Sequence, residues 1–408
     1  MLKTFSISNI TAGLVAVMVA YSSSIVIIFQ AATAAGASAS EISSWLLAIG
    51  IGMAVTCIGF SLHYRIPIFM GWSTPGAALL ITSLVGVSMP EAIGAFIFSG
   101  LLIFLSGVTG IFEKTMKYIP RSITAAMLAG ILLQFGINIF VALKTQSVLV
   151  IALCLTYLIG KRLFPRFVIL LILILGITIA NLRGLVHLDN FHMALSTPVF
   201  TMPVFSFPIL LSVGIPLFII TMTSQNIPGI AVIRASGYTP AISPIISWSG
   251  ITNILLAPFG CFSVNLAAIT AAICLSKEAD LDSTQRYKAT IIGGLFYLLA
   301  GLFGASVVAL ISALPQELIL TVAGLALLNT IASSLTIAME DEFQREPALI
   351  TLLVSCSGVT LFGIGGAFWG LIAGLLTFAL MQVSPNTIFL KNFSIEKSLK
   401  LAFFKRSE

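Results

Sequence analysis

Apolar stretches of helical length follow one another along almost the whole chain, separated by short polar connections. The hydrocarbon core of a bilayer is about 30 Å thick, and about 20 helical residues are needed to cross it. Only 8% of the 408 residues are charged and 58% are hydrophobic, whereas soluble domains carry about 25% charged residues. The sequence therefore predicts an all-α polytopic membrane protein that has no room for a soluble domain.

A chain of this length allows at most about fourteen membrane-spanning segments with short loops. Fourteen apolar runs can be marked, and an even number places both termini on one side of the membrane. The runs are 10–34, 43–62, 66–86, 91–111, 122–143, 147–160, 167–180, 207–229, 242–256, 257–276, 289–312, 318–339, 348–362 and 366–382. Of these, 147–160 and 167–180 are the shortest, and a re-entrant hairpin is an alternative for this pair.

The basic residues indicate the orientation, because short cytoplasmic loops collect Lys and Arg. With the N-terminus inside, all of the 20 Lys and Arg except Lys144 and Arg183 fall on the inner side. The net charge of +6 is therefore explained by membrane orientation, and no nucleic-acid partner is expected. Both termini are predicted to be cytoplasmic.

The longest connection, 181–206, lies near the midpoint and divides the chain into two halves of seven spans, 1–190 and 191–384, before a cytoplasmic tail, 385–408. Ser73, Ala77 and Ala78 of the first half recur in order as residues 263, 267 and 268 of the second. Because seven is odd, the second half starts from the opposite side of the membrane. The halves are therefore predicted to be inverted repeats, the arrangement that lets a transporter alternate between two faces.

The third span of each half is interrupted, at GWSTPGAALL (71–80) and at PFGCFSVNLAA (258–268). Proline removes a backbone donor, and non-helical backbone inside lipid is tolerated only where it is buried or lines a cavity. We expect half-helices that start near the midplane, with Ser73 or Thr74 as the cap and Pro75 in the first turn of a helix of about 12 residues.

Two helix N-termini that face each other would attract an anion, because each bears about half a positive charge. The alternative is that both segments are kinked helices in which Ser and Thr satisfy the freed backbone groups.

A second polar cluster, TMTSQN (221–226), is expected to end the first span of the second half before Pro228. Its counterpart in the first half begins at Tyr21. Gln225 and Asn226 are costly in lipid and are predicted to face protein or a cavity, with a helix-capping role as the alternative. Phe69, Trp72, Phe259 and Phe262 flank the breaks and are weaker candidates to stack on a substrate ring.

Several other features indicate structure. Gly366, Gly370 and Gly374 form a small-residue packing stripe, and the five isolated cysteines are expected to be apolar filler. His187, Asp189 and His192 are expected to be solvated rather than to bind a metal. No metal and no cofactor are expected.

At GWSTPGAALL, TSQNIPG and NLAAITAAI the sequence resembles the benzoate:proton symporter family (BenE) over nearly its whole length. The resemblance implies import of benzoate or a similar small aromatic carboxylate with a proton, across the cytoplasmic (inner) membrane of a bacterium. It also implies the seven-plus-seven inverted fold of uracil and anion transporters. In that fold spans 1–4 and 8–11 form a core and spans 5–7 and 12–14 form a gate. A homodimer is compatible with it.

Together, the residue pattern and the resemblance give eight candidate substrate-binding residues: Tyr21, Ser73, Thr74, Gly76, Gln225, Asn226, Ser263 and Asn265. Gln225 and Val264 stand where uracil-transporting relatives have glutamates, so the usual intramembrane proton carriers are missing. Glu91, Glu317, His63 and the carboxylate of the substrate are the alternatives for carrying the proton.

Three other functions are weighed against this one. A passive channel or facilitator for small anions would share the same site, and a transporter of nucleobases or inorganic anions would share the same fold. An intramembrane enzyme is disfavoured, because it would need a nucleophile or a metal constellation inside the membrane, and all three histidines lie in loops or at span ends.

Overall fold

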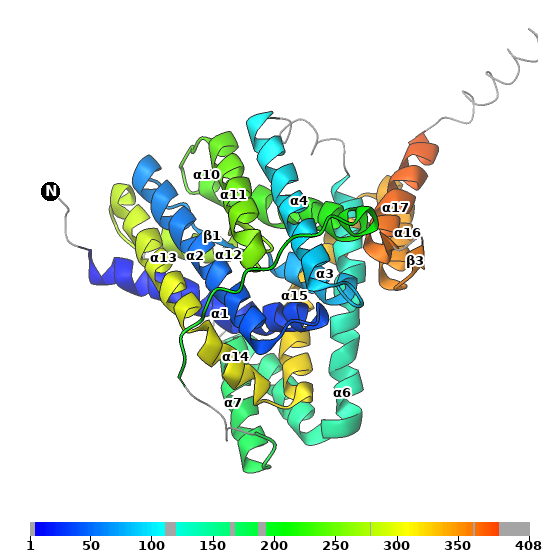
Figure 1. The fold of residues 1–408 in the computed structure, drawn as a ribbon, viewed down its shortest axis with the longest axis horizontal. Helices are drawn as coiled ribbons and strands as arrows, with labels where there is room; N and C mark the ends of the chain where they lie inside the picture. Colours follow the sequence, from blue (N-terminus) through cyan, green and yellow to red (C-terminus); the bar gives the residue numbers. More distant parts are fainter. Residues whose placement is uncertain are drawn as a thin grey trace, which may run out of the picture.

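The computed structural model describes residues 5–110, 120–163, 168–186, 193–277, 279–361 and 364–382 (Figure 1). The predicted tail, the histidine group of the midpoint loop, and the basic residues Lys3, Lys114, Lys117 and Arg166 lie outside these residues. Within them, six helices are long and apolar enough to cross a membrane, or eight if two bent pairs each count as one span. The protein is thus mostly helical, while the fourteen-span count and the inverted repeats stay predictions.

One group of helices packs through close contacts at small residues. In it α1 packs on α13, α2 on α13, and α4 on α11. An added Cβ on Gly50 of α2 would lie 2.8 Å from the Tyr297 carbonyl oxygen of α13, so the two backbones approach closely there. The members are α1 (Ile7–Ala34), α2 (Ala39–Tyr64), α4 (Met89–Val108), α11 (Ile242–Leu256), α13 (Tyr287–Leu302) and α14 (Gly304–Ser312).

A second group has α6 at its centre, packed on α15 and α16, while α16 packs on α17. Non-helical backbone at Gln146 divides α6 where the sequence predicts a break between two spans. The glycine stripe is confirmed: an added Cβ on Gly374 would collide with Thr351 of α16. The members are α6 (Arg121–Leu163), α7 (Val168–Leu182), α15 (Gln316–Met339), α16 (Arg345–Cys356) and α17 (Gly366–Gln382). Two short strands, β3 (Thr360–Leu361) and β4 (Ile364–Gly365), pair antiparallel just before α17 begins.

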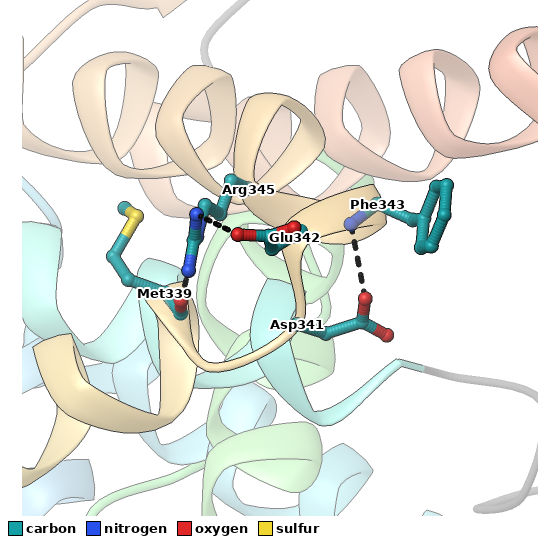
Figure 2. A network of polar contacts seen from close by, with 5 residues as sticks. All are labelled: Met339, Asp341, Glu342, Phe343 and Arg345. Atoms are coloured by element: carbon teal, nitrogen blue, oxygen red, sulfur yellow. Dashed lines mark hydrogen bonds and ion pairs between the residues drawn. The ribbon is translucent and has the colours of Figure 1, made fainter.

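The acidic loop between α15 and α16 closes a tight turn through η5 (Glu342–Gln344), as Figure 2 shows. The carboxylate of Asp341 accepts from the Phe343 N–H (3.0 Å). Arg345 donates to the Met339 carbonyl (2.9 Å) and to Glu342 (3.0 Å). Asp341 therefore caps η5 and Glu342 pairs with Arg345, so these acidic side chains have a local structural role.

The polar run 221–226 does not end its span, so that expectation and the capping alternative for Gln225 and Asn226 are both wrong. The helix is continuous as α8 (Phe207–Ile209), η1 (Leu210–Gly214), α9 (Ile215–Thr221), η2 (Met222–Asn226) and α10 (Ile227–Ala235). Both η1 and η2 are π-helical turns, and each is followed two residues later by a proline, Pro216 or Pro228. The wider turn accommodates the proline ring, which would otherwise clash with the preceding turn.

The midpoint connection is bound to the first group as an extended strap, residues 193–206 (the green trace that crosses in front in Figure 1). Its N–H groups donate to Leu302 of α13 (from Ser196, 2.7 Å), to Pro258 (from Thr201, 2.8 Å) and to Pro90 of α4 (from Val204, 2.9 Å). The strap therefore ties together the ends of three elements of that group.

Gly260 lies within the second interrupted span, in the turn between η3 (Ala257–Phe259) and its extended segment. Its φ is +97°, and an added Cβ would lie 1.7 Å from the Trp45 ring. That ring is fully buried against Phe96 and Phe262. Gly260→Ala is expected to lower the free energy of unfolding by about 3 kcal/mol through the clash and the left-handed backbone.

Thermal unfolding in detergent checks this, with Gly36→Ala as the matched control. Gly36 is also left-handed (φ +74°), but nothing lies within 4 Å of its added Cβ. The control variant should lose only about 1–2 kcal/mol. Equal losses in the two variants would show that the contact with Trp45 has no energetic weight.

Candidate functional site

Both predicted interruptions are present, and they cross each other. β1 (Met70–Trp72) pairs antiparallel with β2 (Val264–Leu266), with Gly71 opposite Asn265. This pairing satisfies backbone groups that no helix satisfies at this depth. The kinked-helix alternative is therefore wrong for these two segments.

The two half-helices differ in length. α3 (Thr74–Ser83) begins directly after β1, with Ser73 as its cap and Pro75 in its first turn, as predicted. α12 (Ile269–Leu275) has seven residues and no side-chain cap, so it is shorter than α3. The run VNLAAIT has neither a Ser-Thr-Pro signal nor a capping side chain next to the helix start.

A buried chain of polar groups joins the two interrupted spans. Ser73 Oγ accepts from the Gly76 N–H (3.0 Å). The side-chain oxygen of Asn265 accepts from the Ser73 N–H (3.0 Å) and from Ser263 Oγ (3.1 Å). Its side-chain nitrogen donates to the Leu266 carbonyl (3.2 Å). Ser263 Oγ in turn contacts Thr221 Oγ1 of α9 (3.2 Å). We call Thr221, Ser263, Asn265 and Ser73 the crossover chain; each is at most 1% exposed.

Two asparagines from neighbouring helices hold the other edge of β2. Asn226 Oδ1 accepts from the Leu266 N–H (2.9 Å). Asn253 of α11 accepts from the Val264 N–H (2.6 Å), and Ser249 donates to the Val264 carbonyl. Sequence reasoning missed Ser249 and Asn253, although two polar residues one helical turn apart in an apolar span were a usable signal.

Three of the predicted site residues keep polar groups that the protein does not use. Gln225 is half-buried, and its side chain makes no hydrogen bond among the described residues. Thr74 is also half-buried, and Tyr21 is partly exposed. By contrast, Ser73, Asn226, Ser263 and Asn265 are buried and bonded to protein.

The span that includes Gln225 packs along the crossover. Leu217 of α9 contacts the position of Gly76 in α3, with an added Cβ there at 2.8 Å. One turn later Thr221 bonds Ser263, and Gly229 of α10 packs so closely on Leu266 that an added Cβ would lie at 2.7 Å. Gln225 lies in η2, the π-helical turn that follows Thr221 and precedes Gly229 in the chain, and η2 itself contacts β2.

The aromatic residues form a cluster behind β1. The Tyr21 and Trp72 rings meet edge to face (4.9 Å), and Trp72 donates to Ser24 Oγ (2.8 Å). Phe69 packs on Tyr297 (5.5 Å). Phe69 and Phe262 are at most 1% exposed, so they pack the core and offer no open face to a substrate ring.

Tyr21 also borders an apolar groove of about 310 Å³ between α1 and α13. The groove is lined by Leu14, Val17, Met18, Tyr21, Phe296, Leu299, Ala300 and Phe303.

The three residues weighed as proton carriers lie in terminal turns of helices. Glu91 lies in the first turn of α4, where it accepts from Ser88 Oγ (2.7 Å), and Glu317 lies in the first turn of α15. His63 lies in the last turn of α2 against the Tyr64 ring (4.6 Å). Among the described residues no three His, Cys, Asp or Glu side chains gather as a metal site.

Comparison with known proteins identifies relatives of this chain. The chain is 46% identical over 384 residues to the inner membrane protein YdcO of Escherichia coli K12, covering 94% of this chain and 98% of that protein. It is 40% identical over 379 residues to the benzoate membrane transport protein of Acinetobacter baylyi, covering 93% and 96%.

Solved structures show the same fold at low sequence identity. The transmembrane domain of the cyanobacterial bicarbonate transporter BicA matches with a TM-score of 0.57 at 14% identity, covering 90% of this chain and 97% of that one. SLC26A9 matches with a TM-score of 0.58 at 12% identity, covering 92% and 65%. The protein is therefore a multi-pass membrane protein with a transporter fold. The family model described as benzoate membrane transport protein matches residues 3–380, and the chain belongs to that family (BenE).

Proposed function

We propose that the chain is a secondary active transporter that imports benzoate, or a similar small aromatic carboxylate, together with a proton by alternating access. The observation on which this rests is the crossover of two interrupted spans, with unused polar groups of Gln225 and Thr74 beside it. Interrupted helices at mid-membrane are the usual site of substrate binding in transporters with this type of fold. The relative named as a benzoate membrane transport protein supports the substrate class.

The packing of the two helix groups supports alternating access. The first group, with the crossover elements β1, α3, β2 and α12 that pack on it, acts as the core; the second, around α6 and α15, acts as the gate. α3 and η2 contact α6, and α1 contacts α15, so the crossover lies on the side where core meets gate. Movement of one group against the other would then open this site to each side of the membrane in turn.

We assign different roles to the eight candidate residues. Thr74, Gln225 and Tyr21 contact the substrate, because they are partly exposed. The buried Ser73, Asn226, Ser263 and Asn265 are positioning residues that hold β1 and β2 in register. Gly76 contributes space, because Leu217 packs directly against it.

Purified protein in liposomes tests the proposal with labelled benzoate. An inward proton gradient at clamped membrane potential is expected to raise the initial rate of protein-dependent uptake, and unlabelled benzoate inside is expected to accelerate labelled uptake. Protein-free liposomes under the same gradient are the essential control, because the neutral acid crosses lipid unaided.

The alternatives give different results in the same assay. An anion channel would respond to membrane potential without a proton gradient and would show no acceleration by internal substrate. Competition by uracil or bicarbonate in place of benzoate would indicate the other substrate classes.

A further inference from the structure

The Gln225 amide is the polar side chain that the crossover leaves open. It lies on the wide turn η2, which contacts β2, and has no hydrogen-bond partner among the described residues. An amide in a membrane span without a partner is costly, so this position favours a ligand that both donates and accepts.

The first turn of α3 and the helices that pack against η2 provide little positive charge. In the first turn of α3 the Gly76 N–H is taken by Ser73 Oγ, the Ala77 N–H by the Ser73 carbonyl, and Pro75 has none. That leaves the Thr74 N–H as the open donor of this turn among the described residues. The basic side chains on the helices that pack against η2 are all exposed and lie in terminal turns or beside the α6 kink: Arg121, Lys144, Lys161 and Arg162 of α6, and Arg234 of α10.

A carboxylate and a carboxylic acid would meet this amide differently. A carboxylate offers only acceptors, so one of its oxygens would face the amide oxygen, and its full charge would lose its hydration without a cation. A carboxylic acid donates its O–H to Gln225 Oε1 and accepts from Gln225 Nε2, so both groups of the amide are used. Its remaining carbonyl lone pair is available to the Thr74 N–H.

We propose that the substrate bound beside Gln225 is the neutral carboxylic acid, so that the coupling proton crosses the membrane on the substrate itself. This inference rests on the proposed function. The O–H bond forms in the water on one side and breaks in the water on the other, and no protein group gains or loses a proton in between. Because only the neutral acid binds, the apparent affinity for total benzoate falls by about tenfold, or about 1.4 kcal/mol, for each pH unit above the pKa of the acid.

Transport of the neutral acid needs no acidic residue inside the membrane to carry the proton. The Asp, Glu and His side chains of the described residues all lie in loops or terminal turns of helices: Glu41, His63, Glu91, Asp280, Asp282, Glu317, Glu340, Asp341, Glu342 and Glu346. The glutamine at position 225 then has a function of its own, because an ionised glutamate there would repel the carboxylate form and would need its own proton to pair with the acid.

Competition binding to the purified full-length protein tests the inference, with labelled benzoate as the probe. Benzamide is neutral and can form the same two hydrogen bonds as the acid, whereas benzenesulfonate has a similar shape but stays anionic at any usable pH. Benzamide is expected to compete at least about tenfold better than benzenesulfonate. Benzenesulfonate that competes as well as benzamide, or better, overturns the proposal.

Gln225→Met keeps the length of the side chain and removes both hydrogen-bonding groups, so competition by benzamide should weaken by about tenfold or more. The matched control is Gln285→Met, a half-buried glutamine at the end of η4 (Ser283–Gln285), which should leave the competition unchanged. Equal benzamide affinity in both variants would also overturn it. Failure of the proposed function would instead appear as a lack of protein-dependent uptake in liposomes.

Discussion

Gln225→Ala is expected to reduce protein-dependent benzoate uptake by about 100-fold or more, which corresponds to about 2.7 kcal/mol, while folded protein remains at the wild-type level. The expected loss is large because a site built to hydrogen-bond its substrate is left with no substitute donor or acceptor. Folding should be unaffected, because the Gln225 side chain is half-buried and bonds no described residue. Removing it therefore leaves no protein group without its partner.

Initial rates in liposomes and thermal unfolding in detergent, measured on the same preparation, check both halves of this prediction. The control is Gln285→Ala, which removes a half-buried amide from the end of η4, where it donates only to the adjacent Thr284 among the described residues. Wild-type uptake in Gln225→Ala would remove this residue from the substrate site. A lowered melting temperature would show instead that the amide supports the fold.

The break in the first interrupted span could be predicted, with its cap narrowed to Ser73 or Thr74, because Ser-Thr-Pro is a local signal. Ser73 caps α3 and Pro75 lies in its first turn, where a missing N–H has no cost. The second break was predictable in position but not in form. The length of α12 depends on β2 pairing with a segment almost 200 residues away, and local propensity does not report that contact.

The role of each polar residue could not be predicted, because the same residue types contact substrates and support the protein backbone. Gln225 and Asn226 are adjacent amides on one helix, yet only Asn226 reaches β2. Both lie in the π-helical turn η2, which changes the angle between successive side chains, so a helix of regular pitch assumed from the sequence does not give their directions.

The strap 193–206 shows a similar limit for connections. The sequence marks it as the joint between two halves, because it is long and lies at the midpoint. Its extended backbone is fixed by contacts with Ser44, Pro90 and Pro258, three positions without any shared sequence signal. The strap is thus bound to α2, α4 and η3, so the proposed movement of core against gate would occur at other connections.

Asn265→Ala is expected to abolish uptake for a different reason, with a loss of stability of about 2–4 kcal/mol. The amide joins β2 to the cap of α3, and its removal leaves the Ser73 N–H and the Leu266 carbonyl unpaired in a fully buried site. Uptake and melting temperature should therefore fall together, in contrast to Gln225→Ala. Asn181→Ala, at an exposed helix end, is the control and should change neither. If Asn265→Ala lost uptake with an unchanged melting temperature, Asn265 would belong with the substrate-contacting residues; if it lost neither, the crossover chain would have no part in holding the site.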